Sequence, residues 1–363
     1  MKKVGILTFH NAINYGAVLQ TYALYKVLIN LGAQTKVIDY RASFNEKRFA
    51  KKKLKYWVNP RNIYNALFRN SYQTFNNKIF DDFIQSHICL TSPIRDKSGL
   101  YSLNDEFDCF ISGSDQVWNL ACTENDESYF LDFVTDVSKR NSYAASIGYT
   151  EFPPDKVDKY KSLLQNINNI SVREKEAVGL ISTLIGRDVQ HVLDPTLLLN
   201  KEEWNVLIDG ISRPEHEEYM LLYLMSEDKE LINFAKTHAK KHGLKIIYIN
   251  QRFFKMKGAN NIKDISPQLW LSYIYNAQVV VTNSFHGLIF SLNFKTDVYT
   301  KYIPRSIANS RLSTVIDIFD LHYRRIGSES FNPYKQIDFE RITKITDALR
   351  NKSISFLNRV LHD

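Results

Sequence analysis

Short apolar segments and amphipathic helical segments alternate along almost the whole chain, and this alternation restricts the fold more than any other feature. An apolar run at residues 4–9 has the composition of a strand, a helical pattern covers residues 17–31, and a second strand-like run covers residues 35–40. Two strands joined by a helix in this way are typically parallel, with the helix covering one face of their sheet. The sequence therefore predicts an α/β protein.

The alternation falls into two series. The first continues with strands expected at 108–112, 142–147, 169–173 and 189–193 and a helix at 174–185. The second has strands expected at 219–225, 245–250, 278–282 and 297–301, and helices at 227–242, 267–277, 284–293 and 311–319. A chain of 363 residues commonly divides into two compact units. We therefore expect two doubly wound, Rossmann-like domains at residues 1–205 and 206–337. A C-terminal helix at 338–363 follows, for which packing back on the first domain is one arrangement.

One segment, residues 45–90, interrupts the alternation. Aromatic and aliphatic residues recur in it at helical spacing between Phe68 and Phe83. Residues 47–78 carry nine basic side chains and no acidic one, and the whole chain has a net charge of +8. Such an excess of positive charge attracts anionic partners. We interpret the segment as a basic helical insertion in the first domain. Because no nucleic-acid motif accompanies it, we do not expect a nucleic-acid partner.

The N-terminus and the cysteines bear on location and metal binding. The apolar run at 4–9 is too short for the hydrophobic region of a secretory signal, and no small-residue cleavage site follows it. No apolar stretch is long enough to cross a bilayer, so we expect a cytoplasmic protein.

The three cysteines show no CxxC pairing, and no set of His, Cys, Asp or Glu has metal-ligand spacing. We predict reduced cysteines and no bound metal.

Polar residues cluster directly after several expected strands, where doubly wound sheets bind their ligands and helix N-termini offer free N–H groups. The first cluster consists of His10, Asn14, Tyr15, Gly16 and Gln20. A capped turn without a ligand would explain Asn14 and Gly16 but not the full polar set, so we favour a binding loop. The loop contains neither GxGxxG nor a P-loop lysine, which gives nucleotide binding by those two motifs no support.

The second cluster follows the strand expected at 108–112 and contains Asp115, Gln116, Trp118 and Asn119. Helix capping would explain a single aspartate. A carboxylate, two amides and an aromatic surface in one loop are what sugar recognition requires. Asp115 is in addition a candidate general base for a sugar hydroxyl.

The third strand end places Arg173 at the start of a helix. A guanidinium there either holds a carboxylate or phosphate of a ligand, or forms an ion pair with Glu174, Asp194 or another acid. The sequence leaves both interpretations open.

The fourth cluster follows the strand expected at 278–282. Asn283 and Ser284 open a helix there, and His286 and Gly287 lie in its first turn. A lone histidine is more often structural than catalytic. An imidazole beside the free amides of a helix N-terminus favours anion binding and proton donation, so we predict a functional role.

In this order, the four segments resemble the polysaccharide pyruvyl transferase family. The resemblance is carried by the stretches GILTFHNAINYGAVLQTYAL, ISGSDQVWN, SVREKEA followed by VLDPTLLL, and TNSFHGLIFSLNF, with a weaker match in NSRLSTVIDIFDL. It covers roughly residues 4–320.

This resemblance implies two Rossmann-like domains that face each other across a cleft, as in GT-B glycosyltransferases. It implies phosphoenolpyruvate as donor and co-substrate, with no other cofactor. On the donor side it implies roles for His286, Arg173 and, less directly, Arg311, and we add their neighbours Asn283, Ser284 and Gly287. The acceptor side would be formed by the first two clusters: His10, Asn14, Tyr15, Gly16, Gln20, Gln116, Trp118 and Asn119.

The implied reaction forms a pyruvate ketal on two sugar hydroxyls. It needs an acid, a base and cations for a carboxylate and a phosphate. We assign His286 as acid or phosphate ligand, Arg173 as anion clamp and Asp115 as base. Two alternatives remain: a GT-B-type glycosyltransferase with a nucleotide-sugar donor, and a non-enzymatic carbohydrate-binding protein.

The basic insertion has two interpretations in this setting. In the first, the acceptor glycan would be carried on a polyprenyl diphosphate at the inner face of the plasma membrane. Residues 47–78 would then make peripheral contact with anionic headgroups or with that diphosphate. Alternatively, the segment is a solvated basic helix packed by its aromatic stripe.

Overall fold

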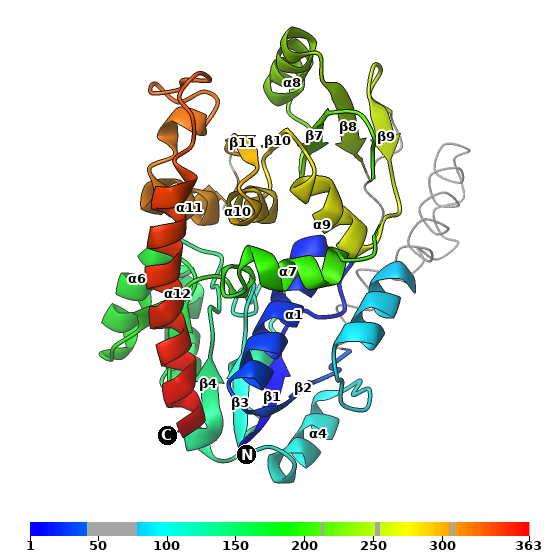
Figure 1. The fold of residues 1–363 in the computed structure, drawn as a ribbon. Helices are drawn as coiled ribbons and strands as arrows, with labels where there is room; N and C mark the ends of the chain where they lie inside the picture. The colour runs from blue at the N-terminus through cyan, green and yellow to red at the C-terminus, as the bar shows by residue number, and fades with distance from the viewer. Residues whose placement is uncertain (42–77, 212–213, 251–254, 305, 307–308, 363) are drawn as a thin grey trace, which may run out of the picture.

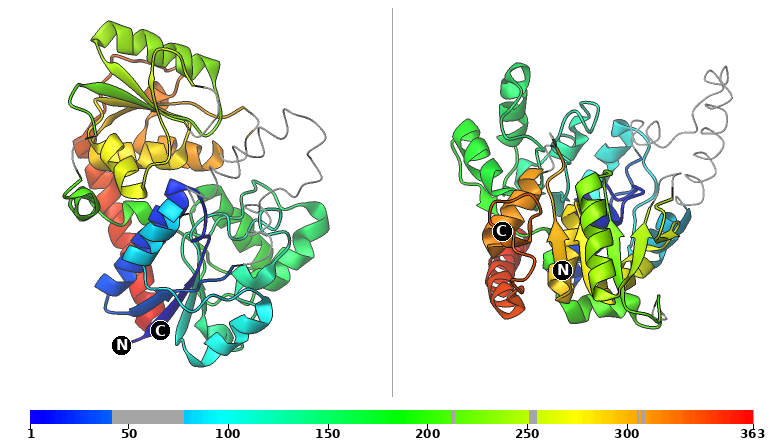
Figure 2. Two further views of the ribbon diagram at one scale, coloured as in Figure 1. Left: turned by 90° about the vertical axis from the view of Figure 1, so that its right-hand side faces the viewer. Right: turned by 90° about the horizontal axis from the view of Figure 1, so that it is seen from above.

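The computed structural model describes residues 1–41, 78–211, 214–250, 255–304, 306 and 309–362. The basic part of the insertion, residues 47–77, and the membrane contact expected of it lie outside these ranges. Two α/β domains are stacked one above the other, and each is built around a parallel sheet (Figures 1 and 2). The expected fold class, two Rossmann-like domains in the GT-B-like arrangement, is confirmed.

The first domain contains a parallel sheet in the order β2-β1-β3-β4. Single parallel bridges continue it to a short pair, β5 and β6. Because β1 lies between β2 and β3, the helices leave the sheet in opposite directions at the carboxyl ends of β1 and β3, where doubly wound sheets bind ligands. The strands are β1 (Lys3–Leu7), β2 (Gln34–Val37), β3 (Cys109–Ser112), β4 (Arg140–Ser142), β5 (Ser171–Val172) and β6 (Gln190–His191).

Helices cover both faces of this sheet. The α-helices are α1 (Tyr15–Asn30), an unlabelled helix at 78–87, α4 (Lys97–Leu100), α5 (Val157–Leu164), α6 (Lys175–Ile185) and α7 (Lys201–Ile208). Short 3-10 turns complete the domain: η2 (Tyr101–Asp105), η3 (Glu127–Phe130), η4 (Val137–Lys139), η5 (Pro154–Lys156) and η6 (Pro195–Leu197).

The second domain has a parallel sheet in the order β11-β10-β7-β8-β9. Its order reverses between β7 and β10, so a second ligand-binding edge lies at their carboxyl ends. The strands are β7 (Tyr219–Tyr223), β8 (Lys245–Ile249), β9 (Asn260–Ile262), β10 (Val279–Thr282) and β11 (Asp297–Thr300). The helices are α8 (Lys229–His242), α9 (Pro267–Tyr275), α10 (Phe285–Phe294), α11 (Asn309–Phe319) and η7 (His322–Arg324), with α12 (Phe339–His362) at the end of the chain.

One continuous hydrophobic cluster connects the domains, reaching from Val4 in β1 to Leu221 in β7. At its centre Tyr15 of α1 stacks on Trp270 of α9, with ring centroids 5.2 Å apart and planes inclined by 7°. Helices α7, α9 and α10 lie between the two sheets (Figure 1). Extensive apolar packing of this kind holds two domains in a defined orientation.

Helix α12 runs alongside both domains and ends near the N-terminus (Figure 1). It packs against the first domain, where the Lys2 side chain donates a hydrogen bond to the Val360 carbonyl and Ser353 accepts one from the Leu193 N–H. The chain therefore crosses to the second domain and returns to the first.

Several element boundaries differ from the expectation. Helix α7 occupies residues for which no helix was expected, and the boundary placed at 205/206 falls inside it. A capping box explains this helix, since the Asn200 side chain accepts from the Glu203 N–H while the Glu203 carboxylate accepts from the Asn200 N–H. The strand expected at 142–147 overlaps β4 only at Ser142, because the segment that follows makes only isolated bridges.

Candidate functional site

A cavity of about 430 Å³ lies between the two domains, at the carboxyl ends of β1, β3, β7 and β10. Both domains line it. The first domain supplies Phe9, Asn11, Ala12, Ile13, Asn14, Ala17, Asp115, Gln116 and Cys122. The second supplies Met225, Asn283, Ser284, Phe285, His286, Ile303, Arg311 and Leu312. The cavity therefore brings together parts of three of the four predicted polar clusters.

The N-terminus of α1 forms one wall. Asn14 caps the helix, and its side-chain oxygen accepts hydrogen bonds from the N–H groups of Gly16 (2.9 Å) and Ala17 (3.3 Å). These two amides are therefore not free to bind an anion. A Cβ atom on Gly16 would lie 1.9 Å from Nδ1 of His286. Any other residue at this position would therefore clash with the imidazole unless the ring or the helix moved. Gly16 is thus required because the imidazole from the other domain lies directly against the helix backbone.

The N-terminus of α10 forms the opposite wall and is more open. Ser284 caps it by accepting a hydrogen bond from Gly287 N–H. Within the described part of the chain, no group accepts a hydrogen bond from the N–H of Phe285 or of His286. Two amides at the positive end of a ten-residue helix are suited to accept an anion, so the predicted donor contact at this wall stays a prediction. Gly287 packs on Thr282, whose Oγ1 would lie 2.6 Å from an added Cβ.

Asn283 is held in place by the loop after β7. Its side-chain oxygen accepts from Met225 N–H at 2.7 Å, and its amide nitrogen donates to the Ser226 carbonyl at 2.8 Å. These bonds fix the loop that leads into α10. Asn283 lines the cavity, so its predicted donor contact stays a prediction.

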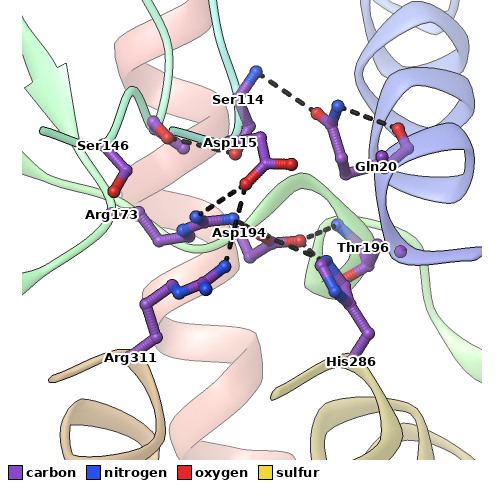
Figure 3. A network of polar contacts seen from close by, with 12 residues as sticks. Gln20, Ser114, Asp115, Ser146, Arg173, Asp194, Thr196, His286 and Arg311 are labelled. Carbon is purple, nitrogen blue, oxygen red and sulfur yellow. Dashed lines mark hydrogen bonds and ion pairs between the residues drawn. The ribbon is translucent and has the colours of Figure 1, made fainter. Parts of the chain in front are cut away.

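A buried ion network lies behind the cavity (Figure 3). The Arg173 guanidinium, with a side chain only 3% exposed, is within reach of three carboxylates. Its Nη1 lies 2.8 Å from Asp194 Oδ2, its Nη2 3.3 Å from Asp115 Oδ1 and its Nε 3.6 Å from Glu174 Oε1. Arg173 thus forms ion pairs with all three acids, and its side chain is not among those that line this cavity. Arg173 positions the carboxylates, and its direct contact with a donor stays a prediction.

Arg311, from the first turn of α11, is the cation that lines the cavity in the described part of the chain. Its Nη1 lies 3.7 Å from Asp115 Oδ1, and the guanidinium packs 5.8 Å from the ring centroid of Phe285. Phe285 also packs against Arg173, at 5.3 Å. Arg311 and Asp115 are therefore adjacent groups of opposite charge, one from each domain, that face the same space.

His286 reaches from α10 into the same network. Its Nε2 lies 3.9 Å from Asp194 Oδ2. Burial, together with the nearby positive charges of Arg173 and Arg311, outweighs the attraction of Asp194 and lowers the pKa of His286 to about 4. The imidazole is therefore neutral at pH 7.

The two aspartates of the network are ionised. Burial alone would raise the pKa of the Asp115 carboxyl, but Arg173 and Arg311 outweigh it and hold the pKa below its usual range. Burial acts in the same direction on Asp194, where His286 and Arg173 lower the pKa. Asp115 therefore presents a carboxylate to the cavity, ready to accept a hydrogen bond from a hydroxyl.

Other predicted acceptor residues lie behind the cavity, in the scaffold. Tyr15 is 1% exposed and donates from its hydroxyl to the Ile265 carbonyl. Gln20 is fully buried and accepts from Ser114 N–H at 3.2 Å. His10 is enclosed by Asp39, whose Oδ1 lies 3.0 Å from its Nε2. These side chains position the loops that carry Asn14 and Asp115, and none of the three lines the cavity.

Trp118 and Asn119 also differ from the expectation. The indole of Trp118 has no exposed surface, stacks on Phe130 and donates from Nε1 to the Tyr129 carbonyl. A sugar-facing position for Trp118 is therefore wrong, because the apolar ring belongs to the core of the first domain. Asn119 is 4% exposed, and its side-chain oxygen accepts from the N–H of Ala121. Of this cluster, Asp115 and Gln116 line the cavity.

Asp194 and Phe285 are parts of the site that sequence reasoning misses. From the sequence, Asp194 is only a possible ion-pair partner of Arg173. Its position directly after an expected strand is the same signal that singled out the other clusters. Phe285 lay inside the fourth cluster, but an apolar side chain there gave no indication that it would pack under two arginines.

The described residues contain no group of three or more His, Cys, Asp or Glu side chains placed to hold a metal ion. Among the same residues, no helix has both the length and the apolar character needed to cross a membrane.

Solved structures with this fold include enzymes of nucleotide sugars. A putative UDP-N-acetylglucosamine 2-epimerase from Listeria monocytogenes matches with a TM-score of 0.50 and 9% identity over 98% of this chain and 90% of that chain. A UDP-GlcNAc 2-epimerase of Methanocaldococcus jannaschii, solved with UDP-GlcNAc and UDP, has a TM-score of 0.48 and 13% identity over 100% and 99% of the two chains. The ADP-heptose LPS heptosyltransferase II of E. coli has a TM-score of 0.39 and 11% identity over 97% and 99%. At these identities the likeness concerns the fold alone.

Comparison with curated proteins gives no match. The family model for polysaccharide pyruvyl transferase matches residues 14–300, which include both walls of the cavity and the ion network up to His286. The chain belongs to the polysaccharide pyruvyl transferase family.

Proposed function

We propose that this enzyme transfers pyruvate from phosphoenolpyruvate to two hydroxyls of a sugar in a surface polysaccharide or its lipid-linked precursor. The products are a cyclic pyruvate ketal and inorganic phosphate. One observation carries the proposal: a single interdomain cavity is lined by an imidazole, a carboxylate, a guanidinium and the open N-terminus of a helix. These are the groups that the reaction requires.

The donor fits the wall formed by the second domain. Phosphoenolpyruvate carries a phosphate and a carboxylate, and this wall offers the amides of Phe285 and His286 together with the charge of Arg311. The first-domain wall carries Asn11, Gln116 and the Asp115 carboxylate, which suit the hydroxyls of a sugar. Donor and acceptor then meet where the two domains face each other.

The first step adds one sugar hydroxyl to C2 of the donor. A C–O bond forms to C2, the C2–C3 π bond takes a proton at C3 from His286, and the hydroxyl proton passes to Asp115. Loss of phosphate then leaves an oxocarbenium ion at C2. The second hydroxyl attacks this ion, and its proton leaves with the phosphate or returns to His286. Asp115, with its lowered pKa, is a weak base, so it takes the first proton as the C–O bond forms and not before.

Burial favours the neutral form of His286, and a bound dianion would change this balance. The phosphate and carboxylate of the donor add negative charge beside the imidazole, which raises the pKa of His286 above about 4. We therefore expect the donor to bind together with a proton. His286 is then charged when the acceptor hydroxyl attacks.

A second candidate function is transfer from a nucleotide-sugar donor. It is favoured by the likeness to the putative UDP-N-acetylglucosamine 2-epimerase of Listeria monocytogenes, at a TM-score of 0.50. This likeness shows the fold and leaves the donor to be measured.

The two functions are separated by what the enzyme releases. We expect inorganic phosphate from phosphoenolpyruvate in the presence of a glycan acceptor, and no nucleotide from UDP- or ADP-sugars with the same acceptor. Mass spectrometry of the acceptor should show the added ketal. Release of nucleotide without release of phosphate would replace the proposed function with the alternative.

The charge of Arg311 gives a sharper test of the donor position. Arg311→Met keeps much of the apolar contact with Phe285 and removes the guanidinium. We expect the KM for phosphoenolpyruvate to rise about ten- to hundred-fold, because a hydrogen bond to a charged group contributes about 1.5–3 kcal/mol. Arg341→Met is the matched control, since Arg341 is 52% exposed in α12 and lies outside the cavity. An unchanged KM in Arg311→Met would show that the donor does not bind at this wall.

We further propose that the enzyme works in the cytoplasm, with residues 47–78 in contact with the anionic inner face of the membrane. The support is the run of nine basic side chains in this segment. Co-sedimentation with vesicles of phosphatidylglycerol at low and high salt tests the contact. Equal recovery in the supernatant at both salt concentrations would leave the segment as a solvated basic helix.

A further inference from the structure

Asp194 is the most firmly held carboxylate of the ion network. It follows β6 in the first domain and is 1% exposed. Its Oδ1 accepts hydrogen bonds from the Thr196 N–H (3.0 Å) and hydroxyl (2.7 Å). Its Oδ2 accepts from Arg173 Nη1 at 2.8 Å. The carboxylate therefore has little freedom to rotate, and the direction of its second oxygen is fixed.

This second oxygen points at His286, 3.9 Å from its Nε2 (Figure 3). Nε2 is buried, and within the described residues it has no hydrogen-bond partner. The other ring nitrogen, Nδ1, lies against the backbone of Gly16, at the edge of the cavity. The two nitrogens thus face different groups: one faces a fixed carboxylate, and the other is left for a ligand.

We propose that Asp194 is the positioning residue of His286: when donor binding adds a proton to the imidazole, Nε2–H closes onto Asp194 Oδ2 and Nδ1–H is directed at the donor. Asp194 touches no substrate in this arrangement. It orients the ring and balances its charge while Nδ1 delivers the proton to C3. This inference rests on the proposed function, which it deepens by naming the nitrogen and its partner.

The charges around His286 come from five segments of the chain, and some favour the protonated ring while others oppose it. Asp194 and Asp115 favour the protonated ring, whereas Arg173 and Arg311 oppose it. The positive N-terminus of α10, on which the histidine itself lies, also opposes protonation. In the empty site the opposing influences and burial prevail. A bound dianion lies near Arg311 and reduces its effect, so the attraction of Asp194 then decides the protonation.

The arrangement also couples catalysis to domain orientation. Asp194 and Gly16 belong to the first domain and His286 to the second, so the proton donor is complete only when the domains are packed as observed. The apolar contact of Tyr15 with Trp270 maintains this packing close to the site. A carboxylate that belonged to the same domain as the histidine would not impose this requirement.

Asp194→Asn tests the role of the charge while preserving the size of the side chain. We expect kcat to fall about 10²-fold, within the usual contribution of general acid catalysis, with little change in the KM for phosphoenolpyruvate. The limb on which kcat falls as pH rises should move to lower pH by about one unit, because one stabilising charge is lost. Calorimetry in buffers of different ionisation enthalpy should show fewer protons taken up on donor binding.

Glu174→Gln is the matched control. It removes another buried carboxylate from the same arginine, 3.6 Å from Arg173 Nε, but Glu174 does not contact His286. The position of the pH limb should stay where it is in the wild type. An equal displacement in both variants would assign the effect to Arg173 and overturn the role of Asp194.

Two measurements keep the inference separate from the proposed function and from misfolding. Nitrogen-15 NMR of His286 in the empty protein, assigned by comparison with His286→Gln, should show a lower pKa in Asp194→Asn than in the wild type, whether or not phosphoenolpyruvate is a substrate. In the wild-type complex with phosphoenolpyruvate, both ring nitrogens should be protonated, with Nε2–H in a strong hydrogen bond. An unprotonated Nε2 in the complex, or an unchanged titration in the variant, would refute the inference.

Discussion

Gly16→Ala is the most direct test of the site, because it adds one methyl group where the two domains touch. The new Cβ would lie 1.9 Å from His286 Nδ1, and 2.3 Å and 2.4 Å from Cγ and Cε1. Ordinary contact begins at 3.4 Å, so the ring or the helix must move by about 1.5 Å, the difference of the two distances. A displacement of about 1 Å at a reacting group lowers catalysis roughly 10²-fold. We expect kcat/KM to fall by at least about that factor.

The effect on stability should be smaller than the effect on activity. Alanine in a helix is favoured over glycine by about 1 kcal/mol, whereas overpacking costs about 1–3 kcal/mol. The free energy of unfolding should therefore fall by no more than about 2 kcal/mol. Phosphate release from phosphoenolpyruvate and urea denaturation measure the two quantities.

Two further variants make this prediction decisive. Gly179→Ala introduces the same change inside α6, where nothing lies within 4 Å of the added Cβ, so activity should persist. In a His286→Ala background, Gly16→Ala should no longer destabilise the protein, because the ring that it meets is gone. If Gly16→Ala alone retained wild-type kcat/KM and stability, the contact between α1 and His286 would be absent, and the geometry of the site would be wrong.

Two other predictions follow from the burial of His286 and Trp118. The folded-state pKa of His286, about 4, lies below its unfolded value near 6.5, so unfolding takes up a proton between these pH values. Stability should therefore decrease as pH falls from 6.5 to 4, by up to about 3 kcal/mol from this group. His286→Asn should lose less stability over that interval in urea denaturation, and identical slopes for both proteins would contradict the low pKa. Trp118→Phe should lower the melting temperature, since the buried indole loses its packing on Phe130 and its bond to the Tyr129 carbonyl, while the KM for the glycan acceptor stays unchanged. A large rise in the KM for the acceptor without loss of stability would instead indicate that Trp118 contacts the acceptor.

The periodic pattern of apolar residues was sufficient to predict the fold class. Strands such as β10 are entirely buried, and a buried strand can be recognised in the sequence by its continuous apolar run. Local capping signals also located helix starts, as at Ser284. Strand ends were less well predicted, because β4 and β5 end where regular pairing gives way to isolated bridges, and pairing between strands is not a local property.

The sequence by itself determined which residue types stand after which strands, and hence that His286 and Asp115 were candidates for one site. Arg311 became a candidate only through the family resemblance. It could not determine which of them face the cavity. Arg173 and Arg311 are chemically identical, yet Arg173 is enclosed by three carboxylates and Arg311 lines the open space. Only tertiary structure decides this, because the charge that compensates an arginine comes from segments far apart along the chain. The same holds for the contact between Gly16 and His286, which exists only where two separately encoded helices meet across the domain interface.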